Sequence, residues 1–86
     1  MNPRYRLARG IRLRCEAGAE PLLLVPEGIV TLNVSAAAIL ETLGEGKSVD
    51  EVVAALHERF DDSEASLAGD VRETLEDFAA AGFVER

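Results

Sequence analysis

Residues 21–43 read PLLLVPEGIVTLNVSAAAILETL, and the spacing of prolines, glycine and apolar runs in this stretch limits what it can form. PLLLV (21–25) is too short for a helix and is typical of a strand covered on both faces. Pro26-Glu27-Gly28 predicts a three-residue hairpin loop with glycine in the left-handed position. IVTLN (29–33) predicts the returning strand, and Ser35 is expected to cap the helix that follows.

A further strand is indicated by GIRLRCE (10–16), where apolar residues alternate with arginine. The three strands then form an antiparallel meander in chain order, with 29–33 at an edge. The alternation places Cys15 on the apolar face, so we expect this thiol to be buried. Residues 1–9 are expected to be a mobile arm.

Three helices are predicted after the strands. The first carries one apolar stripe and ends at Gly44 or Gly46; the stripe consists of Ala36, Ile39, Leu40 and Leu43. Ser48-Val49-Asp50-Glu51 is a capping box, which begins a second helix that continues to Phe60. The third helix spans about 65–81 and ends at Gly82, where Phe83 should pack on Phe78 in a Schellman motif.

Length and composition favour one folded domain over residues 1–86, because 48% of residues are hydrophobic and 29% are charged. Its expected class is α+β: a three-stranded antiparallel sheet followed by three helices, resembling a winged helix. No run approaches the roughly 20 apolar residues of a membrane span, and the first residues lack the apolar core of a signal peptide. We therefore expect a cytoplasmic protein that does not enter membranes.

Catalytic and metal-binding patterns are missing from the sequence. Cys15 and His57 are the only cysteine and histidine, so one chain cannot assemble a Cys/His zinc site. Gly44-Glu45-Gly46-Lys47-Ser48 ends like a phosphate loop, but the earlier glycine of that motif is replaced by Glu41. We expect no enzyme activity, no metal and no cofactor.

Charge is divided unevenly along the chain. Residues 1–15 contain five arginines and no acid, whereas 16–86 contain four basic and sixteen acidic residues, for a net charge of −7. The predicted last helix has one arginine, Arg72, among Asp70, Glu73, Glu76 and Asp77, which disfavours contact with phosphates. The acidic body suits a partner with basic patches, and a winged-helix nucleic-acid binder is kept as the alternative because of the N-terminal arginines.

Several short motifs, taken in order, resemble the PqqD family over nearly the whole chain. They are Arg9-Gly10-Ile11-Arg12-Leu13-Arg14, Leu23-Leu24-Val25-Pro26-Glu27-Gly28, Leu32-Asn33, Ser35-Ala36, Ile39-Leu40 and Asp70-Val71, the last followed at family spacing by Leu75, Phe78 and Gly82. The sequence departs from the family at Val25, where an aromatic is usual, and at Gly44-Glu45-Gly46, which replaces Cys-Asp-Gly.

The resemblance implies a non-catalytic chaperone of pyrroloquinoline quinone (PQQ) biosynthesis. Such a protein binds the ribosomally made precursor peptide PqqA and presents it to the radical S-adenosylmethionine (SAM) enzyme PqqE. A recognition element for another ribosomally synthesized and post-translationally modified peptide (a RiPP recognition element) would have nearly the same sequence features.

In the related domains called RiPP recognition elements, the leader peptide adds as a strand beside the third strand and over the last helix. The resemblance therefore implies a ladder from residues of the edge strand, namely Ile29, Val30, Thr31 and Leu32, and a groove wall from the last helix, namely Leu67, Asp70, Val71 and Thr74. Val30, Leu32, Val71 and Leu75 are equally compatible with a simple core role. Thr31, Asp70 and Thr74 are the better indicators of a groove. The same edge also suits a homodimer.

Overall fold

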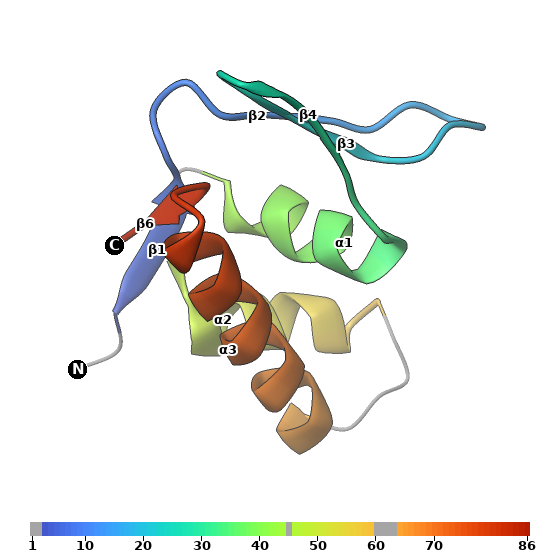
Figure 1. Ribbon diagram of the computed structural model, residues 1–86. Coiled ribbons are helices and arrows are strands. Elements are labelled where there is room, and N and C mark those ends of the chain that lie inside the picture. Colours follow the sequence, from blue (N-terminus) through green and yellow to red (C-terminus); the bar gives the residue numbers. More distant parts are fainter. Residues whose placement is uncertain (1–2, 45, 60–63) are drawn as a thin grey trace.

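The computed structural model describes residues 3–44, 46–59 and 64–86, with no account of side chains at 64 and 65. Helices α1 to α3 pack together on one side, and a three-stranded sheet covers α1 from the other side (Figure 1). The α+β class is confirmed. The elements in chain order are β1 (Arg4–Leu7), β2 (Arg12–Arg14), β3 (Leu22–Val25), β4 (Gly28–Thr31), α1 (Val34–Leu43), β5 (Lys47–Ser48), α2 (Val49–His57), α3 (Glu64–Ala80) and β6 (Val84–Glu85).

Strands β2, β3 and β4 form the predicted antiparallel meander in chain order, with β4 at an edge. The loop differs from the prediction, because Val25 pairs with Gly28 and leaves only Pro26-Glu27 in the turn. Gly28 has φ 150°, a backbone conformation that favours glycine. Central strand β3 is covered on one face rather than two: Leu23 is fully buried, but its neighbours are only half-buried.

A second sheet, of order β5-β1-β6, was not predicted. The expectation of a mobile arm is wrong for residues 4–7, because they form the central strand of this sheet. Tyr5 is 3% exposed and belongs to the core. On the exposed side of β1, Arg4 pairs with Glu51 at 2.7 Å and Arg6 pairs with Glu85 at 3.0 Å. The N-terminal strand thus ties the end of the chain to the start of α2.

Side-chain caps explain how α1 and α2 can each begin so soon after a strand. Asn33, not Ser35, caps α1, because the backbone N–H of Ala36 donates to its side-chain oxygen at 2.7 Å. The capping box of α2 is confirmed, with Ser48 and Glu51 each accepting from the other's backbone N–H. Of the two glycines expected to end α1, Gly44 does so, at φ 53°. Phe60 lies outside the described residues.

The end of α3 forms the predicted Schellman motif. The Phe83 N–H donates to the Phe78 carbonyl at 2.8 Å, and the Gly82 N–H, at φ 84°, donates to the Ala79 carbonyl at 3.1 Å. The two phenylalanine rings lie 6.0 Å apart, centre to centre. This reversal directs β6 back along β1.

The core draws on both sheets and all three helices. Its most deeply buried side chains are Leu23, Leu40, Leu43, Val52, Val71 and Leu75. The prediction for Cys15 is wrong: the residue follows β2 and is exposed, because the strand ends at Arg14 and the alternation ends with it. No helix in the described part of the chain is long and apolar enough to cross a membrane. One domain over residues 1–86 stays a prediction.

Candidate functional site: an open strand edge beside an acidic helix

Strand β4 has an open edge, since within the described residues it pairs only with β3. The Leu32 N–H donates to the Pro21 carbonyl at 3.0 Å, which makes this pair a hydrogen-bonded pair in register with the sheet. Bonded and non-bonded pairs alternate along an antiparallel ladder. The N–H and C=O groups of Ile29 and Thr31 therefore point away from β3, toward the open edge.

The eight residues predicted to form the site divide into two groups. Three are buried in the core, which is the ordinary fate of apolar side chains; these are Leu32, Leu67 and Val71. The other five reach the surface: Ile29, Thr31 and Asp70 are exposed, while Val30 and Thr74 are half-buried. Thr31, Asp70 and Thr74, the residues thought least needed by the core, are all in this second group. Contact of any of the eight with a peptide stays a prediction.

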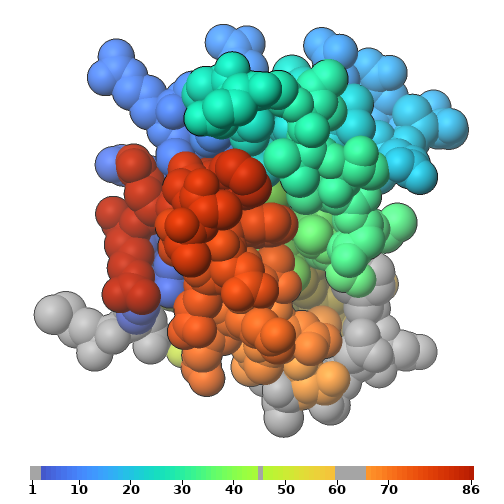
Figure 2. Space-filling model, viewed as in Figure 1, coloured from blue at the N-terminus to red at the C-terminus, as the bar shows by residue number. Residues whose placement is uncertain are grey.

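The two elements of the predicted site lie beside each other on one face of the molecule. Figure 2 shows the surface of β4 and the start of α1, in teal to green, next to the outer surface of α3, in orange to red, with a hollow between them. The main packing partners of α3 are α2 and β6. Strand β4 is not among these main partners.

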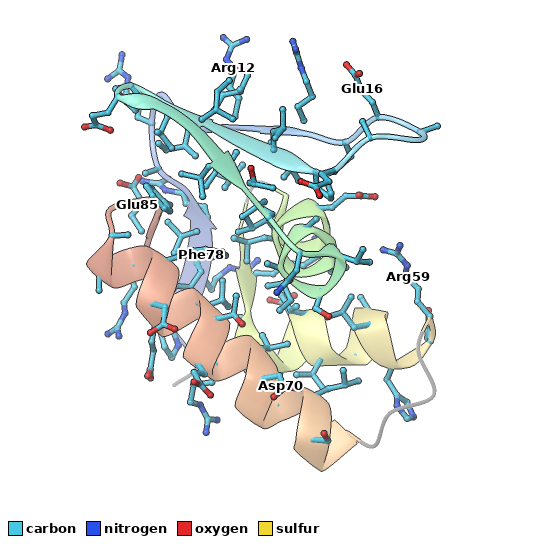
Figure 3. All side chains as sticks on the ribbon, turned by 45° about the vertical axis from the view of Figure 1, so that its right-hand side comes forward. Arg12, Glu16, Arg59, Asp70, Phe78 and Glu85 are labelled. Carbon is cyan, nitrogen blue, oxygen red and sulfur yellow. The ribbon has the colours of Figure 1, made fainter. Side chains whose placement is uncertain are left out.

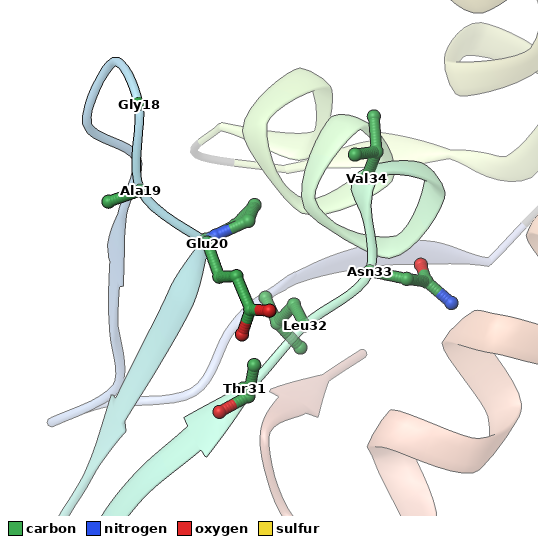
Figure 4. Close-up of a pocket in the computed structure, with 8 residues that line it drawn as sticks. Gly18, Ala19, Glu20, Thr31, Leu32, Asn33 and Val34 are labelled. Carbon is green, nitrogen blue, oxygen red and sulfur yellow. The ribbon is translucent and has the colours of Figure 1, made fainter.

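A shallow open depression continues from the end of β4 (Figure 4). It is lined by Gly18, Ala19, Glu20, Pro21, Thr31, Leu32, Asn33 and Val34. Val34 is 71% exposed and Ile29 is 64% exposed, so a large apolar side chain lies at each end of the β4 edge. Sequence reasoning missed Val34. The signal was its position directly after the Asn33 cap, outside the apolar stripe of α1.

The helix side of the site is acidic. Exposed carboxylates follow α3 on its solvent side, namely Asp70, Glu73, Glu76 and Asp77, with Arg72 as the one described cation of this helix. Figure 3 shows Asp70 in the first half of α3 and Phe78 toward its other end. This surface repels phosphates and favours basic or neutral groups in a ligand.

The described residues show no catalytic constellation. They contain no group of three or more histidine, cysteine or acidic side chains that could hold a metal ion. Partial desolvation, and then the nearby carboxylate of Glu41, raise the pKa of the Cys15 thiol. A raised pKa keeps the thiol protonated at neutral pH, which makes it a poor nucleophile.

A free strand edge with a hollow and a helix beside it is the arrangement that domains use to bind an extended peptide as an added strand. The family model for coenzyme PQQ synthesis protein D (PqqD) matches residues 20–84. The chain belongs to the PqqD family, which confirms the resemblance found in the sequence.

Two curated relatives illustrate the relationship, and both are named PqqA binding protein. The protein of Azotobacter vinelandii is 44% identical over 77 residues, covering 88% of this chain and 83% of the relative. That of Klebsiella pneumoniae strain 342 is 42% identical over 69 residues, covering 79% and 74%.

Two solved structures share the fold. The PqqD truncation of Methylobacterium extorquens PqqCD, described as a functional, stand-alone RiPP recognition element, has a TM-score of 0.82 and 28% identity, covering 96% of this chain and 89% of its own. TbiB1 in complex with the TbiA(beta) leader peptide has a TM-score of 0.72 and 20% identity, covering 93% and 94%. The second likeness shows the fold alone.

Proposed function

We propose that this chain is a non-catalytic peptide chaperone that binds PqqA and presents it to the radical SAM enzyme PqqE in PQQ biosynthesis. Family membership supports the pathway, and the names of the A. vinelandii and K. pneumoniae relatives support PqqA as the ligand. The likeness to the M. extorquens RiPP recognition element supports a recognition role. We place the protein in the cytoplasm, where a ribosomal peptide is made.

Strand addition is the proposed mode of binding, and the open edge of β4 is the observation that carries it. Ile29 and Thr31 offer two N–H donors and two C=O acceptors at a spacing of two residues, as the ladder of an added strand requires. No charged side chain lies on β4 to block pairing, whereas edges that avoid partners usually carry charge.

The surroundings of the edge supply side-chain contacts for the peptide. Alternate peptide side chains would enter the hollow toward Asp70 and Thr74 on α3, and the others would lie over Ile29. At the far end, the depression beside Val34 gives the peptide an apolar contact. Ordering a flexible peptide is costly, so these contacts are needed in addition to the ladder.

A matched pair of proline variants tests strand addition. Thr31→Pro removes an N–H that faces the open edge, so we expect peptide affinity to fall about tenfold while the fold is kept. Val30→Pro removes an N–H that faces β3, so it should disturb the sheet itself. Peptide binding is measured by calorimetry with synthetic PqqA, and folding by circular dichroism.

Unchanged affinity in folded Thr31→Pro would contradict peptide addition at β4. If the chain binds a leader peptide from another modification pathway and does not bind PqqA, strand addition stands as the mode of binding and the assignment to PQQ biosynthesis is wrong. If β4 instead pairs two copies of the chain, sedimentation will show a dimer that PqqA does not dissociate.

A further inference from the structure

The meander β2-β3-β4 has an outer face that no described element covers. Leu13, Leu23 and Val30 are cross-strand neighbours on the inner face, where Leu23 is fully buried against the core. Side chains alternate along strands, so the flanking rows lie on the opposite side. This outer face consists of Arg12, Leu24 and Ile29 in one row and Arg14, Leu22 and Thr31 in the next.

Figure 3 shows Arg12 and Glu16 projecting away from the helices, on the far side of the sheet from the core. Arg12 makes no hydrogen bond or ion pair within the described residues, and Arg14 has only a long contact of 3.9 Å with Glu16. Between and beside the two guanidinium groups lie half-exposed Leu22 and Leu24 and the exposed side chain of Ile29. The two rows of the outer face are therefore basic and aliphatic, and Glu16 is an acidic residue beside them.

This composition is opposite to that of the rest of the molecule. The chain has a net charge of −7, and the described exposed charges of α3 are acidic except for Arg72. Arginine beside aliphatic side chains is typical of protein interfaces, where the apolar centre is desolvated and the charges select the partner. A polyanion such as DNA would meet only two arginines here and repulsion from the acidic body.

We propose that the outer face docks an acidic surface of a folded protein that also carries aliphatic side chains, and that this protein is the enzyme acting on the bound peptide. The proposal rests on the proposed function. Its placement follows from the sheet: the outer face ends at β4, so a protein docked there lies beside a peptide added to the edge. The partner surface thus carries acid, opposite to the basic patch expected from net charge alone.

The test compares two single charge reversals that change the net charge by the same amount. Arg12→Glu alters the outer face, and Arg72→Glu alters the exposed side of α3. We measure binding of purified PqqE to the full chain by calorimetry, with synthetic PqqA present. Arg12→Glu is expected to weaken PqqE binding about tenfold or more and Arg72→Glu by less than about threefold. Raising the salt concentration should weaken the wild type more than Arg12→Glu.

A second variant tests the aliphatic part without changing charge. Leu24→Thr keeps a good strand former in β3 and removes apolar contact area, so PqqE binding should fall about fivefold. The affinity of both variants for PqqA alone should stay within about twofold of wild type, since neither residue supplies the open edge. Amide NMR spectra confirm that each variant is folded.

The outcomes separate this inference from the function on which it rests. If wild-type chain binds PqqA but no PqqE, presentation to that enzyme is wrong and the inference falls with it. If wild type binds PqqE and Arg12→Glu binds it equally well, docking on the outer face is wrong while the proposed function stands. Binding of a duplex DNA probe that Arg12→Glu abolishes would make the face a polyanion site and overturn the proposal.

Discussion

The two sheets of this small protein differ in how much of each is left open. In β5-β1-β6 the outer strands are two residues long, the central Tyr5 is buried, and ion pairs connect the central strand to α2 and β6. In β2-β3-β4, within the described residues, β2 and β4 each pair only with β3, and one whole face remains uncovered. The difference supports the proposed function, because the first sheet completes the fold and the second leaves backbone groups unpaired at the edge where a peptide would add.

The largest expected effect on stability comes from disrupting the β5-β1-β6 sheet. Tyr5→Ala should lower the free energy of unfolding by about 3–5 kcal/mol, because a buried aromatic ring is lost from the core. For a domain with a typical stability of roughly 5–15 kcal/mol, much of the protein would then unfold easily. Urea denaturation followed by circular dichroism measures the change.

The matched variant in the open sheet is Ile29→Ala. Its side chain is 64% exposed, so the free energy of unfolding should change by no more than about 0.5 kcal/mol. Equal losses in Tyr5→Ala and Ile29→Ala would show that the two sheets do not differ in this way.

Peptide affinity should depend on Ile29, although the stability of the fold does not. Ile29→Ala removes an apolar side chain that the added peptide would cover, so affinity for PqqA should fall roughly tenfold, or about 1.4 kcal/mol. Ile29→Val keeps most of the contact area and should remain within about threefold of wild type. Fluorescence anisotropy with labelled peptide makes the comparison. An unaltered Ile29→Ala affinity would remove this side chain from the site.

A smaller effect tests the junction between β4 and α1. Asn33→Ala should destabilise the protein by about 1 kcal/mol, because the N–H of Ala36 loses its acceptor. Ser35→Ala serves as the control and should be nearly neutral, since Ser35 is exposed within the first turn. Thermal unfolding of both variants decides between the two caps, and a larger loss from Ser35→Ala would restore the cap expected from sequence.

The smallest expected effect is a loss of stability at acid pH, where Glu51 contacts the β5-β1-β6 sheet. The backbone N–H of Ser48, and next the guanidinium of Arg4, lower the pKa of Glu51 below its ordinary value of 4.5. The folded state therefore binds fewer protons than the unfolded state, and the stability from Glu51 is present above pH 4.5 and lost as pH falls through the lower folded pKa. Glu51→Gln should show a weaker dependence of unfolding free energy on pH below 4.5 than wild type. Urea titrations at several pH values measure it; equal dependence would exclude this role.

Local chemistry predicted much of this fold. The capping box at Ser48, the glycine stop at Gly44 and the Schellman contact of Phe78 with Phe83 each depend on residues close in sequence. The meander order was predicted for the same reason, since alternating and continuous apolar runs were separated by short turns.

The largest error involves contacts between distant parts of the chain. Residues 4–7 carry arginines and resemble a solvated end; their strand exists because Lys47-Ser48 and Val84-Glu85 lie on either side of it. Asn33 and Ser35 are both good N-cap residues, and which of them caps α1 depends on the residue at which β4 ends. At the site, sequence placed the edge correctly, but only the register reveals that Ile29 and Thr31 face outward.

The central claim, that β4 accepts a peptide as a further strand, is tested most directly by amide hydrogen exchange followed by NMR with and without PqqA. Addition of the peptide should slow exchange at the Ile29 and Thr31 amides, which face the open edge, and leave Val30, already bonded toward β3, nearly unchanged. Saturating peptide that leaves exchange at Ile29 and Thr31 as fast as in the free protein would contradict strand addition at β4.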